Sequence, residues 1–176
     1  MSRQLVVALV LLCCTTLNAY AQDDTAEHRR LAAHPSTPVA MLAKLARDTD
    51  WKVREILAHN RRLSPALLDQ LADDPQVEVR IAVATNLTTG DKTFQKLAHD
   101  KVAAVRSVVA RFEYVPVSAL RILAHDRDVD IRLAVTRNLN TDSGTLRVLQ
   151  HDPDPDVVAA AGQALQQRQD AGLPKN

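Results

Sequence analysis

The sequence predicts an all-α solenoid of about five stacked two-helix repeats, each 26 residues long. A fixed period is the first observation, because one leucine recurs without an insertion at Leu45, Leu71, Leu97, Leu123 and Leu149. The second is composition: the 176 residues are 46% hydrophobic but only 3% aromatic, so the core must be aliphatic. Third, each repeat holds two short helical patterns, neither long enough to persist alone. Stacking of neighbouring repeats must therefore supply the stability.

Residues 1–21 are predicted to be a secretory signal peptide. A basic residue near the start, an apolar run over 5–12 and small residues at the −3 and −1 positions predict cleavage before Gln22. The run is too short to cross a bilayer. We therefore expect a mature chain with no transmembrane segment, exported to the periplasm or outside the cell. The alternatives are a buried N-terminal helix and a lipid anchor on Cys13 or Cys14.

Composition of the predicted mature chain argues against several function classes. Both cysteines lie in the leader, so we expect no disulfide, thiolate nucleophile or cysteine-held metal cluster. Removing Arg3 from the 22 basic residues leaves 21, which balance 21 acidic residues. With few aromatic side chains as well, the chain is a poor candidate for nucleic-acid binding. Motifs such as Gly-x-Ser-x-Gly and HExxH are absent, so we expect no enzyme, no catalytic residue and no cofactor.

The first helix of each repeat, helix A, has start and stop signals in the sequence. Ser64 is a suitable N-cap and Pro65 suits the first helical position. Leu68 and Leu71 then fall at helical spacing, and the segment 73–75, Asp-Asp-Pro, ends the helix.

The second helix, helix B, is predicted to carry Val79, Ala82 and Val83 and to end near Asn86. Asparagine recurs at this place in Asn60 and Asn138, and tolerance of the left-handed conformation that closes a helix explains the recurrence. Phe112 departs from the pattern.

The two ends of the repeat array should be atypical, because each has a neighbour on one side only. We predict a cap or frayed segment over residues 22–30, the solenoid domain over 31–166, and a disordered tail over 167–176.

The repeat pattern resembles the leucine-rich repeat variant family over about residues 31–163. The resemblance is carried by Leu-Ala-x-Asp followed by Val/Ile-Arg, by Ala-x-Asn before the loops, and by Thr37-Pro38 leading helix A. It implies a right-handed superhelix related to HEAT and armadillo repeats, built from short α-helices or from α-helices that alternate with 3₁₀ helices. The family's N-terminal iron–sulfur cysteine cluster is absent from the predicted mature chain, so no redox role carries over.

Two charged columns recur six residues apart in four repeats. They could form an anion-binding stripe, or a structural ladder in which each arginine bonds an aspartate or turn carbonyl of its own or the next repeat. We favour the ladder, because a ligand surface should vary between copies. Breaking one internal rung should cost roughly 1–3 kcal/mol if the rung is buried. The ladder residues are Asp48, Asp74, Asp100 and Asp126 with Arg54, Arg80, Arg106 and Arg132.

Three histidines, His99, His125 and His151, occupy one position in successive repeats. Metal binding would require their nitrogens to meet about 2 Å from one ion, whereas stacked positions are separated by a helix spacing of roughly 8–10 Å. We therefore expect a solvent-facing row and assign no metal ligand. A metal-binding or enzyme-accessory envelope protein that uses this row is the alternative function.

Two exposed positions of helix B vary from repeat to repeat and could bind a partner. Mixed apolar, hydroxyl and basic residues on a regular frame suit contact with a protein or peptide. The sequence therefore predicts a non-catalytic interaction scaffold, with ordinary solvated side chains as the alternative. Neither the identity of the partner nor the oligomeric state can be inferred. The predicted partner-binding residues are Glu55, His59, Ile81, Thr85, Ser107, Arg111, Leu133 and Arg137.

Overall fold

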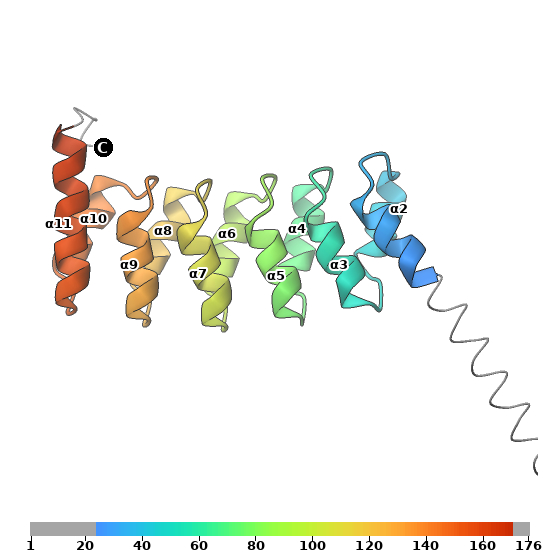
Figure 1. Ribbon diagram of the computed structural model, residues 1–176, viewed down its shortest axis with the longest axis horizontal. Helices are drawn as coiled ribbons and strands as arrows, with labels where there is room; N and C mark the ends of the chain where they lie inside the picture. Colours follow the sequence, from blue (N-terminus) through green and yellow to red (C-terminus); the bar gives the residue numbers. More distant parts are fainter. Residues whose placement is uncertain (1–23, 171–176) are drawn as a thin grey trace, which may run out of the picture.

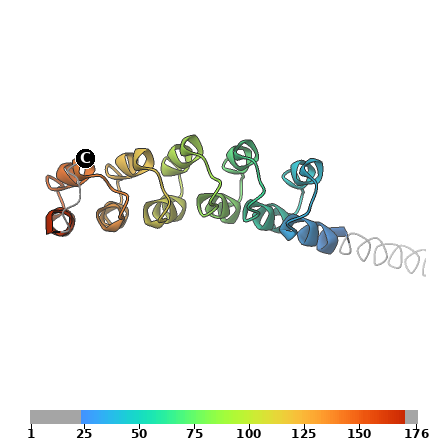
Figure 2. The same cartoon turned by 90° about the horizontal axis from the view of Figure 1, so that it is seen from above.

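The computed structural model describes residues 24–170. In this range the chain forms α-helices joined by turns, with neither a strand nor a 3₁₀ helix. The predicted signal peptide lies outside the described residues. Figure 1 shows the helices side by side along one axis, and Figure 2 shows that they form two rows. The prediction of an all-α solenoid is confirmed, and its short helices are all α-helices within the described part.

Each repeat contributes one helix to each row. The helices A are α2 (Val39–Leu45), α4 (Pro65–Leu71), α6 (Asp91–Ala98), α8 (Val117–Leu123) and α10 (Ser143–Leu149). The helices B, nearer the viewer in Figure 1, are α3 (Trp51–Ala58), α5 (Val77–Ala84), α7 (Ala103–Arg111), α9 (Val129–Arg137) and α11 (Pro155–Asp170). Consecutive helices B contact each other along the whole row.

The core lies between the two rows and repeats with the sequence. The five periodic leucines of the helices A are at most 1% exposed. Facing them, each helix B buries one aliphatic side chain near its start, and these are also at most 1% exposed: Val53, Val79, Val105, Ile131 and Val157. Full burial of one such side chain contributes about 1.5–3 kcal/mol, which explains how helices of seven to nine residues are held.

Buried hydrogen bonds join the loops that follow the helices B. The side-chain amide of Asn86 donates to the carbonyl oxygens of Ala58 (2.6 Å) and Asn60 (3.2 Å) of the preceding repeat. Its Oδ1 accepts the backbone N–H of Thr88. The same three bonds recur at Asn60 and at Asn138. The predicted left-handed closure is wrong for Asn138, whose φ is −76°, because its side chain joins successive repeats instead.

Phe112 occupies the equivalent position in the loop after α7. Its ring stacks on Phe94 with the ring centres 6.0 Å apart, and it meets the edge of Tyr114 at 5.7 Å. An aromatic cluster therefore replaces the amide bonds at this junction.

Both ends of the described chain are helical. Residues 24–33 form a helix at the place of a helix B, so 24–30 are an ordered cap within the described range rather than frayed. The predicted disorder is wrong for residues 167–170, because α11 continues to Asp170. Gln166 donates to Asp170 and Arg168 donates to the carbonyl of Leu139, and no proline or glycine interrupts this turn. Residues 171–176 lie outside the described part.

Candidate protein-interaction surface

The arginine and aspartate columns form a ladder between successive repeats. Arg80 Nε lies 2.6 Å from Asp100 Oδ2, and a terminal nitrogen of Arg80 lies 3.1 Å from Oδ1. The other terminal nitrogen donates to the carbonyl of Asp74 in its own repeat, at 2.7 Å. Each arginine thus forms a bidentate ion pair with an aspartate of the next repeat and a hydrogen bond to a backbone carbonyl of its own repeat. The same geometry recurs at Arg54–Asp74, Arg106–Asp126 and Arg132–Asp152.

The ladder extends one residue beyond the predicted set at each end. His28 Nδ1 lies 2.6 Å from Asp48 Oδ2, so this histidine takes the place of an arginine in the first rung. Asp152 accepts the last rung. His28 lies one period of 26 residues before Arg54, and Asp152 lies one period after Asp126. This spacing could have identified both residues from the sequence. Arg54 bonds the backbone carbonyl of Asp48 and not its carboxylate.

The rungs are buried and their charges stabilise each other. The four arginine side chains are 6–12% exposed and their aspartate partners 5–7%. Burial opposes ionisation of Asp100, but the hydrogen bonds from Arg80 and from the N–H of Val102 outweigh it and hold the pKa of this carboxyl below its usual range. Hydrogen bonding to Asp100 likewise raises the pKa of Arg80. These guanidiniums therefore serve the frame and do not present a stripe to a ligand.

The histidine row is not brought together at one point. His99 and His125 line one open groove, whereas His151 Nδ1 lies 3.0 Å from the carbonyl of Arg147 on its own helix turn. Within residues 24–170, no group of three or more His, Cys, Asp or Glu side chains has a metal-binding arrangement.

The predicted partner-binding residues fall into two sets. Glu55 lies on α3 and Ile81 on α5, while His59 and Thr85 are the C-caps of these two helices. Ile81 packs partly against the core, and the Thr85 hydroxyl donates to the carbonyl of Ala82, 3.1 Å away. Ser107 on α7 is half-buried. In contrast, Arg111, Leu133 and Arg137 line one groove of about 330 Å³ between α7 and α9.

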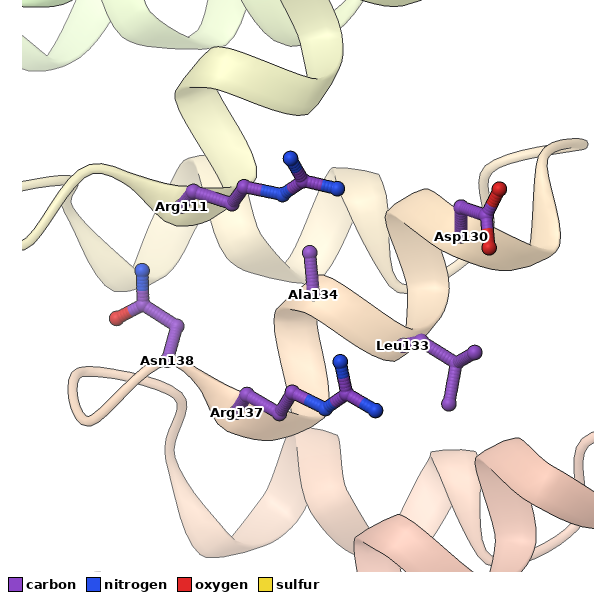
Figure 3. A pocket seen from close by; sticks show the side chains of 6 residues that line it. All are labelled: Arg111, Asp130, Leu133, Ala134, Arg137 and Asn138. Carbon is purple, nitrogen blue, oxygen red and sulfur yellow. The ribbon is translucent and has the colours of Figure 1, made fainter.

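This groove, which we call the α7–α9 groove, has three further lining residues: Asp130, Ala134 and Asn138 (Figure 3). Asp130, Leu133, Ala134 and Arg137 are spaced by three and four residues, so one face of α9 supplies them. That spacing was visible in the sequence, although comparing equivalent positions between repeats passed over Asp130 and Ala134. Among the described residues, neither Arg111 nor Arg137 has a hydrogen bond or ion pair from its guanidinium, and both are exposed.

Comparisons with known proteins agree with this geometry. The family model described as leucine rich repeat variant matches residues 51–76, one period from α3 to the turn before α5. The repeat at residues 51–76 therefore matches the leucine-rich repeat variant family. The resemblance stated from the sequence is thereby confirmed.

A solved structure described as a leucine-rich repeat variant with a novel repetitive structural motif is similar to this chain at 28% sequence identity, with a TM-score of 0.58. The similarity covers 74% of this chain and 52% of that one, so this chain spans about half the length of the solved protein. Comparison with curated proteins gives no match. In the described part of the chain, no helix combines the length and apolar character that crossing a membrane requires.

Proposed function

We propose that this chain is an exported, non-catalytic scaffold that binds a protein or peptide on the exposed face of its helices B. One observation carries the proposal: the arginine–aspartate pair that joins repeats recurs at four successive junctions, while the outward-facing residues of the helices B change from copy to copy. A repeat scaffold of this kind is suited to protein interaction. Because the frame is preformed, binding would cost little ordering of the scaffold.

The exposed face offers the chemistry that an interface needs. Arginine and aliphatic side chains meet in the α7–α9 groove, and arginine is enriched where proteins bind each other. Outside the groove, the same face carries acidic, hydroxyl and histidine side chains, so each repeat would make a different contact.

Affinity capture tests the proposed function. The mature chain, residues 22–176, is tagged and used to isolate partners from an envelope extract, with identification by mass spectrometry. The double variant Arg111→Glu/Arg137→Glu should retain its melting temperature and lose the captured partner. The control Arg47→Glu/Arg147→Glu changes two exposed arginines on the side of the helices A and should capture as the natural chain does. Equal capture by all three proteins would contradict the proposal.

Export is tested separately by the intact mass of the protein recovered from cells. Cleavage before Gln22 gives a chain that starts at that residue. A diacylglycerol adduct on Cys13 or Cys14 would instead support a lipid-anchored scaffold. Retention of residues 1–21 without an adduct would contradict export by this signal.

Metal binding is a second candidate function, favoured by the shared groove of His99 and His125. Calorimetric titration with zinc or copper tests it. Saturable binding at micromolar metal that is lost in His99→Gln/His125→Gln would support this function, and no saturable heat would remove it.

A further inference from the structure

We propose that the α7–α9 groove binds an acidic peptide segment, with a carboxylate held between Arg111 and Arg137 and a neighbouring apolar side chain on Leu133 and Ala134. This inference rests on the proposed interaction function and specifies the chemistry of the partner.

The two arginines line the same groove from adjacent helices. Figure 3 shows Arg111 from α7 and Arg137 from α9 on the two sides of Ala134, whose small side chain lies between them. Both are exposed and without a carboxylate partner in the described chain, whereas each ladder arginine already holds one. A guanidinium presents paired donors that match a carboxylate, and two such groups can hold both of its oxygens.

The frame does not require arginine at these positions. A basic residue in the last helical turn is favourable to the helix dipole, and this effect alone could account for an arginine there. The equivalent positions in the two preceding repeats, however, are His59 and Thr85, the C-caps of α3 and α5, which are eight residues long where α7 and α9 have nine. Arg111 and Arg137 are therefore a local feature of two adjacent helices.

Charge on the rest of the face restricts the site to this pair of helices. Asp130 lies at the far end of the groove from Asn138, and the guanidiniums of Arg111 and Arg137 lie between these two residues in Figure 3. An acidic group would therefore be attracted to the middle of the groove and repelled at its Asp130 end. Towards the N-terminus, Glu55 on α3 and the exposed Glu78 on α5 would also repel an acidic segment.

Apolar surface lies next to the arginines. Leu133 and Ala134 form part of the groove lining. Immediately beyond the ends of the same two helices, Leu139 is 91% exposed and Tyr114 is 61% exposed. Large apolar side chains so exposed at neighbouring loops indicate a contact surface. The groove is open to solvent, which suits a chain that passes through it rather than a molecule enclosed by it.

Binding of defined peptides to the mature chain tests the inference. The probe is a short fluorescein-labelled peptide of Glu, Leu and Gly, compared by fluorescence anisotropy with a peptide in which Gln replaces each Glu. We expect the Glu peptide to bind about tenfold more tightly, as the loss of one charge-assisted contact implies. Arg111→Gln/Arg137→Gln should abolish this preference, whereas Arg47→Gln/Arg147→Gln should preserve it. Melting temperatures of both variants establish that the fold is intact.

Three results would overturn the inference: no binding of the Glu peptide, equal binding of the Glu and Gln peptides, or equal loss in both double variants. The last would mean attraction by overall charge alone. The proposed function has a different outcome, because a natural partner that Arg111→Glu/Arg137→Glu fails to capture, but that the Glu peptide does not displace, would preserve the interaction surface and reject the acidic ligand.

Discussion

A single rung of the ladder connects three parts of the chain. Arg80 bonds the carboxylate of Asp100 and the carbonyl of Asp74, and each of these aspartates also accepts a backbone N–H two residues further along. The arginine thus fixes two turns at once. Desolvation of both charges opposes the gain from pairing, so a rung's value is clearest when one partner is removed.

Arg80→Ala should lower the free energy of unfolding by about 3 kcal/mol, because it leaves Asp100 buried without its partner. The comparison is Arg121→Ala, which removes an ion pair to Asp142 from a side chain that is 68% exposed. That change should cost no more than about 1 kcal/mol. Urea denaturation followed by circular dichroism measures both. A similar small loss in the two variants would show that the rungs are not what holds the repeats together.

Between elements, the ladder ties each helix B to the turn that starts the next helix B. Its aspartates must be ionised to do so. Hydrogen bonding from Arg132 holds the pKa of Asp152 below its usual range, and the pairing of Asp126 with Arg106 does the same there despite burial. A lowered pKa in the folded state contributes stability above the unfolded value and loses it as the pH falls through the folded value.

The free energy of unfolding should therefore be insensitive to ladder protonation from pH 7 to about pH 5, and should decrease as the pH falls below 3.8, the ordinary pKa of an aspartate carboxyl. Urea denaturation at a series of pH values measures this dependence. Arg80→Ala should flatten the acid limb, since Asp100 loses the partner that lowers its pKa, and Arg121→Ala should leave most of that limb in place. If the loss of stability at acid pH is the same in Arg80→Ala as in the natural chain, carboxyl groups other than Asp100 cause the pH dependence.

The helices were predictable from the sequence, whereas the contacts between repeats were less so. Period and leucine spacing predicted two helices per repeat and their burial, because both are local patterns. The sequence left open whether Arg54 bonds an aspartate of its own repeat or of the next, because Asp74, twenty residues after it, comes near only when repeats stack. The bonds of the Asn86 amide were not predictable for the same reason: the amide reaches a carbonyl of the preceding repeat.

In the whole molecule, each repeat packs mainly against its neighbours, so the free energy of unfolding should be a sum over the repeats and their junctions. Sequence periodicity predicted this much. It could not predict the α7–α9 groove, because a groove depends on how side chains from two helices meet, and the two arginines are ordinary exposed residues when each helix is considered alone. The same independence of repeats makes the architecture testable by removing one.

Deletion of residues 77–102, one full period, should leave a shorter solenoid with unchanged helicity per residue. The new junction joins Gln76 to Ala103, where Arg106 would meet the carbonyl of Asp74 as it now meets that of Asp100, and the pairs Arg54–Asp74 and Arg106–Asp126 persist. The melting temperature should fall, because one repeat and one junction are lost. Circular dichroism at 222 nm measures both quantities. Deleting 77–89 is the matched control: it removes half a period, places helix A where helix B belongs, and should unfold the array. If both deletions reduce helicity per residue equally, the repeats do not stack as independent units.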